Sequence, residues 1–156
     1  MIEVGRGDLL TADVEALVNA VNTVGVMGKG IALQFKHAYP DNYAVYRAAC
    51  KAGKVELGRM LVFDSGRQGH RRYVVNFPTK GHWRSGSTLA GVRAGLVDLV
   101  RVVRERRIES IAVPALGCGN GGLIWDEVRP LIEAAFDELP EVRVLLFPPP
   151  AVDIGT

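Results

Sequence analysis

Short runs of apolar residues alternate along the chain with longer segments in which apolar residues recur every three or four positions. The short runs predict strands at residues 2–4, 16–21, 60–64, 72–77, 110–115 and 142–147. Several are continuously apolar at their centres, which is typical of a sheet covered on both faces. The longer segments predict helices at residues 30–38, 41–52, 88–107 and 126–139. Strands that alternate with helices predict an α/β fold, a three-layer α/β/α sandwich with a mixed, largely parallel central sheet.

The length and composition indicate one folded domain. The chain has 156 residues, of which 48% are apolar and 23% charged, close to the average of a globular protein. We expect the domain to occupy residues 1–148. Residues 149–156 are then a proline-rich tail or the start of a linker, because three consecutive prolines at 148–150 cannot continue a central strand.

The apolar runs, the cysteines and the net charge indicate which compartments, cofactors and partners to expect. No apolar run approaches the roughly 20 residues of a membrane helix, and the acidic start is unlike a signal peptide. Two cysteines, Cys50 and Cys118, cannot form a disulfide framework, which favours the cytoplasm. No spacing of histidine, cysteine and acidic residues suggests a metal site, and no cofactor is expected. The net charge of +2 does not by itself indicate a nucleic-acid partner.

Two glycine-rich segments, residues 22–30 and 117–122, each follow a predicted strand and precede a predicted helix. Such a turn places backbone N–H groups and the positive end of a helix where an anion can sit. The first segment matches neither the Walker A nor the Rossmann pattern, and either segment alone is also compatible with a tight connection. Two such loops at the ends of parallel strands face one crevice. Together they predict a site for a diphosphate held by backbone without a metal.

Three polar residues accompany these loops. Asp8 follows the first strand, where its carboxylate could accept a hydrogen bond from an adenine amino group or cap a turn. Asn19 and Asn22 place two amides at the end of a predicted buried strand. A buried amide more often bonds to backbone than to a ligand, but two amides at one strand end favour a ligand.

The segments 7–9, 18–22, 28–30 and 114–119 together resemble the macro domain, a family of ADP-ribose-binding modules, and the likeness covers residues 1–148. The segment 76–84, Asn-Phe-Pro-Thr-Lys-Gly-His-Trp-Arg, resembles more narrowly the lysine-bearing macro domains. These include terminal ADP-ribose protein glycohydrolase and the DarG family of antitoxins. DarG macro domains remove the ADP-ribose that a DarT toxin attaches to thymidine in single-stranded DNA.

The resemblance implies a DNA ADP-ribosyl glycohydrolase that acts as an antitoxin. Its ligands would be ADP-ribose and ADP-ribosylated single-stranded DNA. A DarT-type toxin would be the partner of the full-length protein, through a region that this chain is not expected to contain. The alternatives are a hydrolase of ADP-ribosylated protein or of ADP-ribose esters, and a non-catalytic ADP-ribose reader.

With the residues above, the resemblance also gives a set of site residues. Lys80 and Asn22 would be catalytic. For Phe147 a hydrophobic plug at the strand end is an alternative to a contact with adenine. The expected ADP-ribose-binding residues are Asp8, Leu9, Asn19, Asn22, Gly28, Lys29, Gly30, Ile31, Thr79, Gly117, Cys118, Gly119, Asn120, Gly121 and Phe147.

Lys80 has two possible chemical roles. As a cation or acid it would stabilise the negative charge that accumulates on a departing base, whereas as a neutral amine it could attack the ribose C1. The related protein glycohydrolase supports the second route with an aspartate after its Gly-Cys-Gly. Residues 119–122 of this chain contain no acid, which favours the first role. A lone lysine after a strand is otherwise a solvated surface charge.

His82, Trp83 and Arg84 follow Lys80 directly and are the expected DNA contacts. An aromatic side chain between basic groups suits single-stranded nucleic acid, although Trp83 could instead pack under its own loop. The basic residues within 67–72 could extend a phosphate track or lie solvated on a hairpin.

Overall fold

The computed structural model describes residues 1–82 and 84–150. In this part of the chain six strands form one sheet in the order β1-β6-β5-β2-β4-β3. The strands are β1 (Ile2–Val4), β2 (Ala16–Asn22), β3 (Leu61–Asp64), β4 (Tyr73–Lys80), β5 (Ser110–Pro114) and β6 (Arg143–Phe147). Only β3 and β4 pair antiparallel, and all other neighbours pair parallel. The predicted mixed, largely parallel sheet is confirmed.

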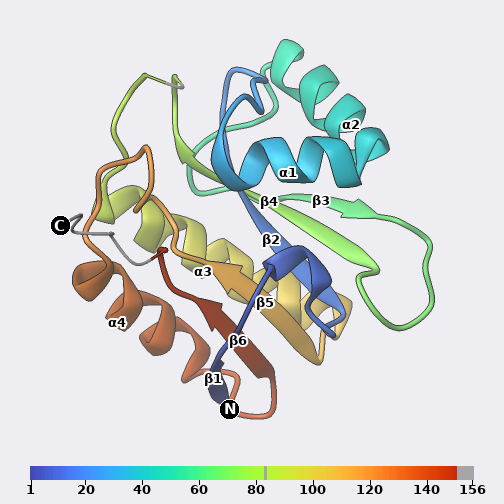
Figure 1. Ribbon diagram of the computed structural model, residues 1–156, viewed down its shortest axis with the longest axis vertical. Helices are drawn as coiled ribbons and strands as arrows, with labels where there is room; N and C mark the ends of the chain where they lie inside the picture. Colours follow the sequence, from blue (N-terminus) through green and yellow to red (C-terminus); the bar gives the residue numbers. More distant parts are fainter. Residues whose placement is uncertain (83, 151–156) are drawn as a thin grey trace, which may run out of the picture.

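Helices cover both faces of this sheet (Figure 1). Helices α1 (Gly30–Ala38) and α2 (Pro40–Lys51) lie on one side, and α3 (Leu89–Arg106) and α4 (Trp125–Phe136) on the other. The strand β2 shows why both faces are needed, because Leu17 and the next residue, Val18, are fully buried in two different apolar clusters. Successive side chains of a strand point to opposite faces, so a continuously apolar strand requires the three layers that the sequence predicts.

The helix α3 approaches β4 closely at Gly95. A Cβ atom at this position would lie 2.3 Å from Cζ of Phe77, so any larger residue would push the helix away from the strand. Thr88 fixes the start of α3, because its hydroxyl accepts a hydrogen bond from the N–H of Gly91 at 3.0 Å. The close packing holds β4 firmly along the length that leads to Lys80.

The strand β4 extends three residues further than the predicted end at residue 77, so that boundary was wrong. Pro78 directly follows the predicted end, and proline cannot donate to a central strand ladder. The neighbouring strand β3 begins only opposite Asn76, and beyond that point β4 pairs with β2 alone. A segment with one open edge tolerates proline, and Lys80 is therefore the last residue of a strand rather than a loop residue.

Residues 151–156 of the predicted tail lie outside the described residues, so the domain boundary at residue 148 stays a prediction. Within the described residues, none of the helices is both long enough and apolar enough to traverse a lipid bilayer.

Candidate functional site

A cleft of about 580 Å³ opens at the C-terminal ends of β2, β4 and β5. This volume lies within the range of small-molecule sites, roughly 300–1,000 Å³. It brings together both glycine-rich loops, the end of β4 and the loop that follows β4. The predicted site residues that line it are Asn22, Gly28, Lys29, Gly30, Ile31, Thr79, Lys80, Arg84, Gly117, Gly119, Asn120 and Gly121.

The first glycine loop is built around the side chain of Asn22. Its Oδ1 accepts hydrogen bonds from the backbone N–H groups of Val24, Gly25 and Val26 at 3.1, 3.2 and 3.3 Å. Its Nδ2 donates to the carbonyl of Val26 at 2.8 Å. This residue was predicted as a ligand contact, and the structure gives it a second role, because the same amide holds the loop in shape.

The start of α1 faces the cleft with uncapped N–H groups. The residue before the helix, Lys29, makes no side-chain capping hydrogen bond, and the first turn holds no acidic residue. Gly30 has a φ of +58°, and a Cβ atom there would meet nothing within 4 Å, so glycine is needed for the backbone conformation. Free N–H groups at a helix start form an anion site.

The second glycine loop is folded tightly on itself. Gly117 has a φ of +73°, and a Cβ atom at Gly121 would lie 2.5 Å from the carbonyl oxygen of Gly117. The N–H of Ser87 donates to the carbonyl of Gly121 at 2.9 Å, which joins this loop to the segment after β4. Gly119 is different, because a Cβ atom there would meet nothing within 4 Å. Of these glycines, Gly119 therefore borders open space in the cleft.

Lys80 lies beside Asn22 at the end of the sheet. The Cα atoms of these two residues are partners across β4 and β2. The backbone N–H and the hydroxyl of Thr23 both donate to the carbonyl of Gly81, at 3.0 and 3.1 Å, and so tie the two strand ends together. Burial, and after it the nearby charge of Lys29, lowers the pKa of Lys80 below the usual lysine value. The cleft therefore holds an amine that loses its proton more readily than a surface lysine does.

The loop after β4 carries the predicted DNA contacts. The N–H of Arg84 donates to Nδ1 of His82 at 3.0 Å, so the other ring nitrogen of His82 carries its proton when the ring is neutral. The exposed Arg84 also lines the cleft. Trp83 lies outside the described residues.

Asn19, although predicted as a ligand contact, is not among the residues that line the cleft. It is completely buried, and its Nδ2 donates to Oδ1 of Asn76 at 3.3 Å. Asn76 in turn exchanges two hydrogen bonds with Asn42 of α2, at 2.8 and 3.2 Å. These three asparagines connect β2, β4 and α2 through a chain of buried amides, which is a structural arrangement.

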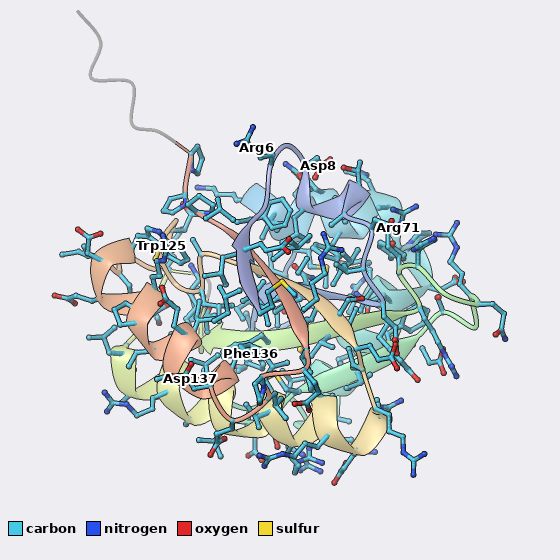
Figure 2. The ribbon with its side chains drawn as sticks, turned by 90° about the horizontal axis from the view of Figure 1, so that it is seen from below. Arg6, Asp8, Arg71, Trp125, Phe136 and Asp137 are labelled. Carbon is cyan, nitrogen blue, oxygen red and sulfur yellow. The ribbon has the colours of Figure 1, made fainter. Side chains whose placement is uncertain are left out.

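Asp8, Leu9 and Phe147 lie at the same edge of the sheet but outside the residues that line the cleft. The Oδ1 of Asp8 accepts from the N–H of Leu10 at 3.0 Å and caps the 3₁₀ helix η1 (Leu9–Thr11). Figure 2 shows Asp8 exposed on the loop after β1. Leu9 is buried in the core, and the ring of Phe147 covers Gly5, where a Cβ atom would meet it at 2.4 Å.

Cys118 is also outside the residues that line the cleft. Its Sγ lies 3.7 Å from the carbonyl oxygen of Leu116, and burial raises the pKa of the thiol. A thiol that resists ionisation is a poor nucleophile. The residue therefore acts as a packing group under the second loop.

The basic hairpin between β3 and β4 does not extend the cleft. Arg72 pairs with Asp64 through two hydrogen bonds of 3.2 and 3.1 Å, and His70 pairs with Asp13. Arg71 donates to the carbonyl of Thr11 at 3.2 Å. A second cavity of about 640 Å³ lies there, lined by Arg67 and Arg71 and also by the acidic Asp41.

Tyr46 does not line the cleft but bonds to Asn22, which does, and the sequence did not reveal this contact. It is fully buried on α2, and its hydroxyl lies 2.7 Å from Oδ1 and 2.8 Å from the carbonyl oxygen of Asn22. A tyrosine on an amphipathic helix is an ordinary core residue by pattern. No signal in the sequence indicates which polar atom its hydroxyl meets.

The cleft, its two backbone loops and the three-layer fold define a class of protein. A model of the macro domain matches residues 18–132, and the chain belongs to the macro domain family. Within that family the chain is similar to the macrodomains of DarG proteins. Among the described residues no group of three or more histidine, cysteine or acidic side chains is placed to hold a metal ion.

Two solved structures and one curated relative illustrate this similarity. The macrodomain of Mycobacterium tuberculosis DarG is 56% identical, with a TM-score of 0.94 over 96% of this chain and 98% of that chain. The macrodomain of Thermus aquaticus DarG is 54% identical, with a TM-score of 0.91 over 96% and 99%. A Mycobacterium tuberculosis protein named DNA ADP-ribosyl glycohydrolase is 56% identical over 149 residues, which are 96% of this chain and 42% of that protein. The chain thus spans less than half the length of this relative.

A Thermosipho africanus DarTG structure in complex with ADP-ribose is 36% identical, with a TM-score of 0.90. The match covers 99% of this chain and 43% of that chain. The resemblance inferred from the motifs at residues 7–9, 18–22, 28–30, 76–84 and 114–119 is confirmed at the level of the family.

Proposed function

We propose that this protein is a DNA ADP-ribosyl glycohydrolase that removes ADP-ribose from thymidine in single-stranded DNA and so reverses a DarT-type toxin. The observation that carries the proposal is that Lys80, whose Cα pairs with that of Asn22, lines a cleft formed by two glycine loops. The 54–56% identity to proteins named for this activity supports it. A cation at this place is unnecessary for a module that only reads ADP-ribose.

The order of the strands suggests how ADP-ribose lies. Asp8 follows β1, the second glycine loop follows β5, and Lys80 ends β4. In the sheet order β1-β6-β5-β2-β4, these features succeed one another at the same edge. Four strand spacings are about 19 Å, a length that suits an extended dinucleotide. The adenine then lies toward β1 and β6, the diphosphate between β5 and β2, and the terminal ribose at β4.

The backbone of the two loops would hold the diphosphate. The uncapped N–H groups at the start of α1 supply donors from one side, and the loop 117–122 closes from the other. Gly119 and Gly30 leave the backbone accessible, since side chains there would occupy open space. Anions are stabilised by such donors and by the positive helix end.

The reaction breaks the bond between the terminal ribose C1 and the thymine nitrogen. The bonding electrons leave with the thymine, while the ribose gains oxocarbenium character. The ammonium group of Lys80 stabilises the departing base and supplies the proton that the base takes up, for which the lowered pKa of Lys80 is favourable. Water adds to C1, and the proton that it loses passes through solvent to the neutral Lys80 amine and restores the ammonium group. The products are ADP-ribose and unmodified thymidine.

A covalent route through the neutral Lys80 amine is disfavoured. It would need a second group to resolve the lysine adduct, and the second glycine loop, residues 117–122, holds Asn120 and no acid. The acids that follow in sequence, Asp126 and Glu127, lie in the first turn of α4, where they stabilise the helix start.

We also propose two partners that would bind outside the nucleotide pocket, the DNA strand and the toxin. Arg84 lines the same cleft as Lys80, which supports the proposal that His82, Trp83 and Arg84 contact nucleotides next to the modified base. Stacking of a base on an aromatic side chain contributes about 1–3 kcal/mol. A DarT-type toxin is the proposed partner of the full-length protein.

The decisive experiment offers two substrates to the purified protein. One is a single-stranded oligonucleotide ADP-ribosylated on thymidine, and the other is a protein ADP-ribosylated on acidic side chains. We expect release of ADP-ribose from the oligonucleotide. Release from the protein alone would contradict the proposal, and tight binding of ADP-ribose without any release would identify a reader. Trp83→Ala should slow release from the oligonucleotide more than it weakens binding of free ADP-ribose, and equal effects would indicate packing.

A further inference from the structure

The hydroxyl of Tyr46 bonds to Asn22, a residue that lines the cleft, although Tyr46 itself does not line it. Tyr46 belongs to α2 and packs in an apolar cluster with Val21, Met27 and Val55. Its ring is completely buried, and its hydroxyl proton is shared between two acceptors of Asn22, Oδ1 at 2.7 Å and the carbonyl oxygen at 2.8 Å. Burial raises the pKa of the tyrosine far above its usual value, so the hydroxyl keeps its proton and remains a donor.

The hydrogen bonds of Asn22 determine which way its amide faces. Oδ1 is surrounded by donors, namely the Tyr46 hydroxyl and the N–H groups of Val24, Gly25 and Val26. The amide nitrogen would meet these donors if the group were turned over, which hydrogen bonding forbids. The NH₂ group is therefore directed away from α2, and one of its two N–H bonds donates to the carbonyl of Val26.

Tyr46 differs from the other three donors in where it is anchored. The N–H groups of Val24, Gly25 and Val26 belong to the loop that Asn22 itself holds, and their distances are 3.1–3.3 Å. The Tyr46 hydroxyl comes from a helix of 12 residues and makes the shortest contact. A functional side chain is held most firmly by a group on a rigid element.

We propose that Tyr46 is a positioning residue that fixes the Asn22 amide so that its second N–H is offered to the terminal ribose. The inference rests on the proposed function, because it requires the terminal ribose to lie at Asn22. Tyr46 touches neither the substrate nor the reacting atoms, and it acts on the site through Asn22.

The test compares two ligands and two tyrosine variants. ADP-ribose and ADP share the adenosine diphosphate, but ADP lacks the terminal ribose. Tyr46→Phe keeps the buried ring and removes the hydroxyl, while Tyr43→Phe removes a hydroxyl from the same helix, on a residue that has no hydrogen bond to Asn22 among those of the described chain. Affinities are measured by calorimetry, and thermal unfolding verifies that each variant is folded.

Tyr46→Phe should bind ADP-ribose about three- to tenfold more weakly than the wild type, the loss that follows from one hydrogen bond. Its affinity for ADP should be unchanged, and Tyr43→Phe should match the wild type for both ligands. The side-chain NH₂ signal of Asn22 in nuclear magnetic resonance spectra should also shift or broaden in ligand-free Tyr46→Phe, because its amide has lost a partner.

Two results would overturn the inference while leaving the proposed function in place. An unchanged affinity of Tyr46→Phe for ADP-ribose would show that the loop N–H groups orient Asn22 without help. Equal losses for ADP and ADP-ribose would show that Tyr46 supports the whole fold rather than the ribose end. A wild-type protein that bound neither ligand would overturn both the inference and the proposed function.

Discussion

Lys80 and Asn22 are partners on adjacent parallel strands, immediately after the register of these strands shifts by one residue. Val21 pairs with Pro78, but Asn22 pairs with Lys80, so Thr79 has no opposite residue. The Thr79 hydroxyl donates to the carbonyl of Val21 at 3.4 Å, where Pro78 offers no N–H to the strand ladder. Such an irregularity re-aims a side chain and is common next to active sites. Here the residue that follows the irregularity, Lys80, lines the cleft.

Replacing this amine should separate turnover from binding. We expect Lys80→Ala to lower the rate of ADP-ribose release by about 10²–10³-fold, the effect of removing one electrostatic group from a transition state. Affinity for free ADP-ribose should change only a few-fold, because the two loops, rather than Lys80, are the proposed contacts of the diphosphate. Single-turnover kinetics and calorimetry measure the two quantities. Lys54→Ala, at an exposed loop lysine, is the matched control, and a parallel collapse of binding would place Lys80 in the nucleotide pocket instead.

The pH dependence distinguishes the two roles of Lys80. Burial and the charge of Lys29 lower its pKa, so a reaction that needs the ammonium form should slow as the pH rises through a value below that of a usual lysine. Lys29→Gln removes one cause of the shift and should move this descending limb of kcat/KM to higher pH. The profiles of the wild type and the variant are compared directly. A rate that instead increases through the same pH range would indicate the neutral amine as nucleophile.

The same pKa has a consequence for stability. A lysine whose pKa is lowered in the folded state is less stable as an ammonium there than in the unfolded chain. Below both pKa values its charge therefore costs stability, and the cost disappears as the pH rises above the unfolded value. Lys80→Gln should unfold in urea at a midpoint equal to or above that of the wild type at neutral pH. A lower midpoint would mean that the charge stabilises the fold.

Gly119 offers a way to block the diphosphate site without disturbing the loop. A side chain at this residue would meet nothing within 4 Å, so Gly119→Val should fold with a free energy of unfolding within about 1 kcal/mol of the wild type. Its side chain would occupy the cleft, and affinity for ADP-ribose should fall at least tenfold, with Gly119→Ala intermediate. Calorimetry and urea unfolding test both statements. Unchanged affinity in the valine variant would place the diphosphate elsewhere.

Gly95 tests the packing of α3 on β4. A methyl group there would overlap the ring of Phe77, and Gly95→Ala should lower the free energy of unfolding by about 1–3 kcal/mol. Val97→Ala is the control on the same helix, since Val97 is 70% exposed and should change stability by less than about 0.5 kcal/mol. Urea unfolding measures both variants. Equal small effects would show that α3 can move away from the sheet without cost.

The fold could be predicted from the sequence because the apolar residues of the strands show which of their faces are buried. Leu17 and Val18 are apolar on successive positions, so both faces of β2 had to be covered. The end of β4 was misplaced because the effect of Pro78 depends on where β3 begins, and the pairing of distant strands is not written in a local pattern. The glycine loops could be predicted because their glycine content, which is visible in the sequence, also allows their backbone conformation.

The roles of single amides were harder to predict. Asn19 and Asn22 lie in one short segment, yet Asn19 bonds to Asn76 in the interior, whereas Asn22 lines the cleft. The face of the sheet and the helix packed on it decide which partner each amide finds. Tyr46 depends entirely on such packing, and only the three-dimensional arrangement reveals its hydroxyl contact.

The strand order has a consequence for how the molecule responds to its ligand. The two outermost parts of the proposed ligand lie on β4 and on the pair β1 and β6, and β1 and β6 come from opposite ends of the described chain. A ligand in the cleft would therefore connect the first and last strands, β1 and β6, with β4 in the middle of the chain. Hydrogen exchange at the seam between β1 and β6 should slow when the nucleotide is present, although Lys80 lies on a different strand, β4.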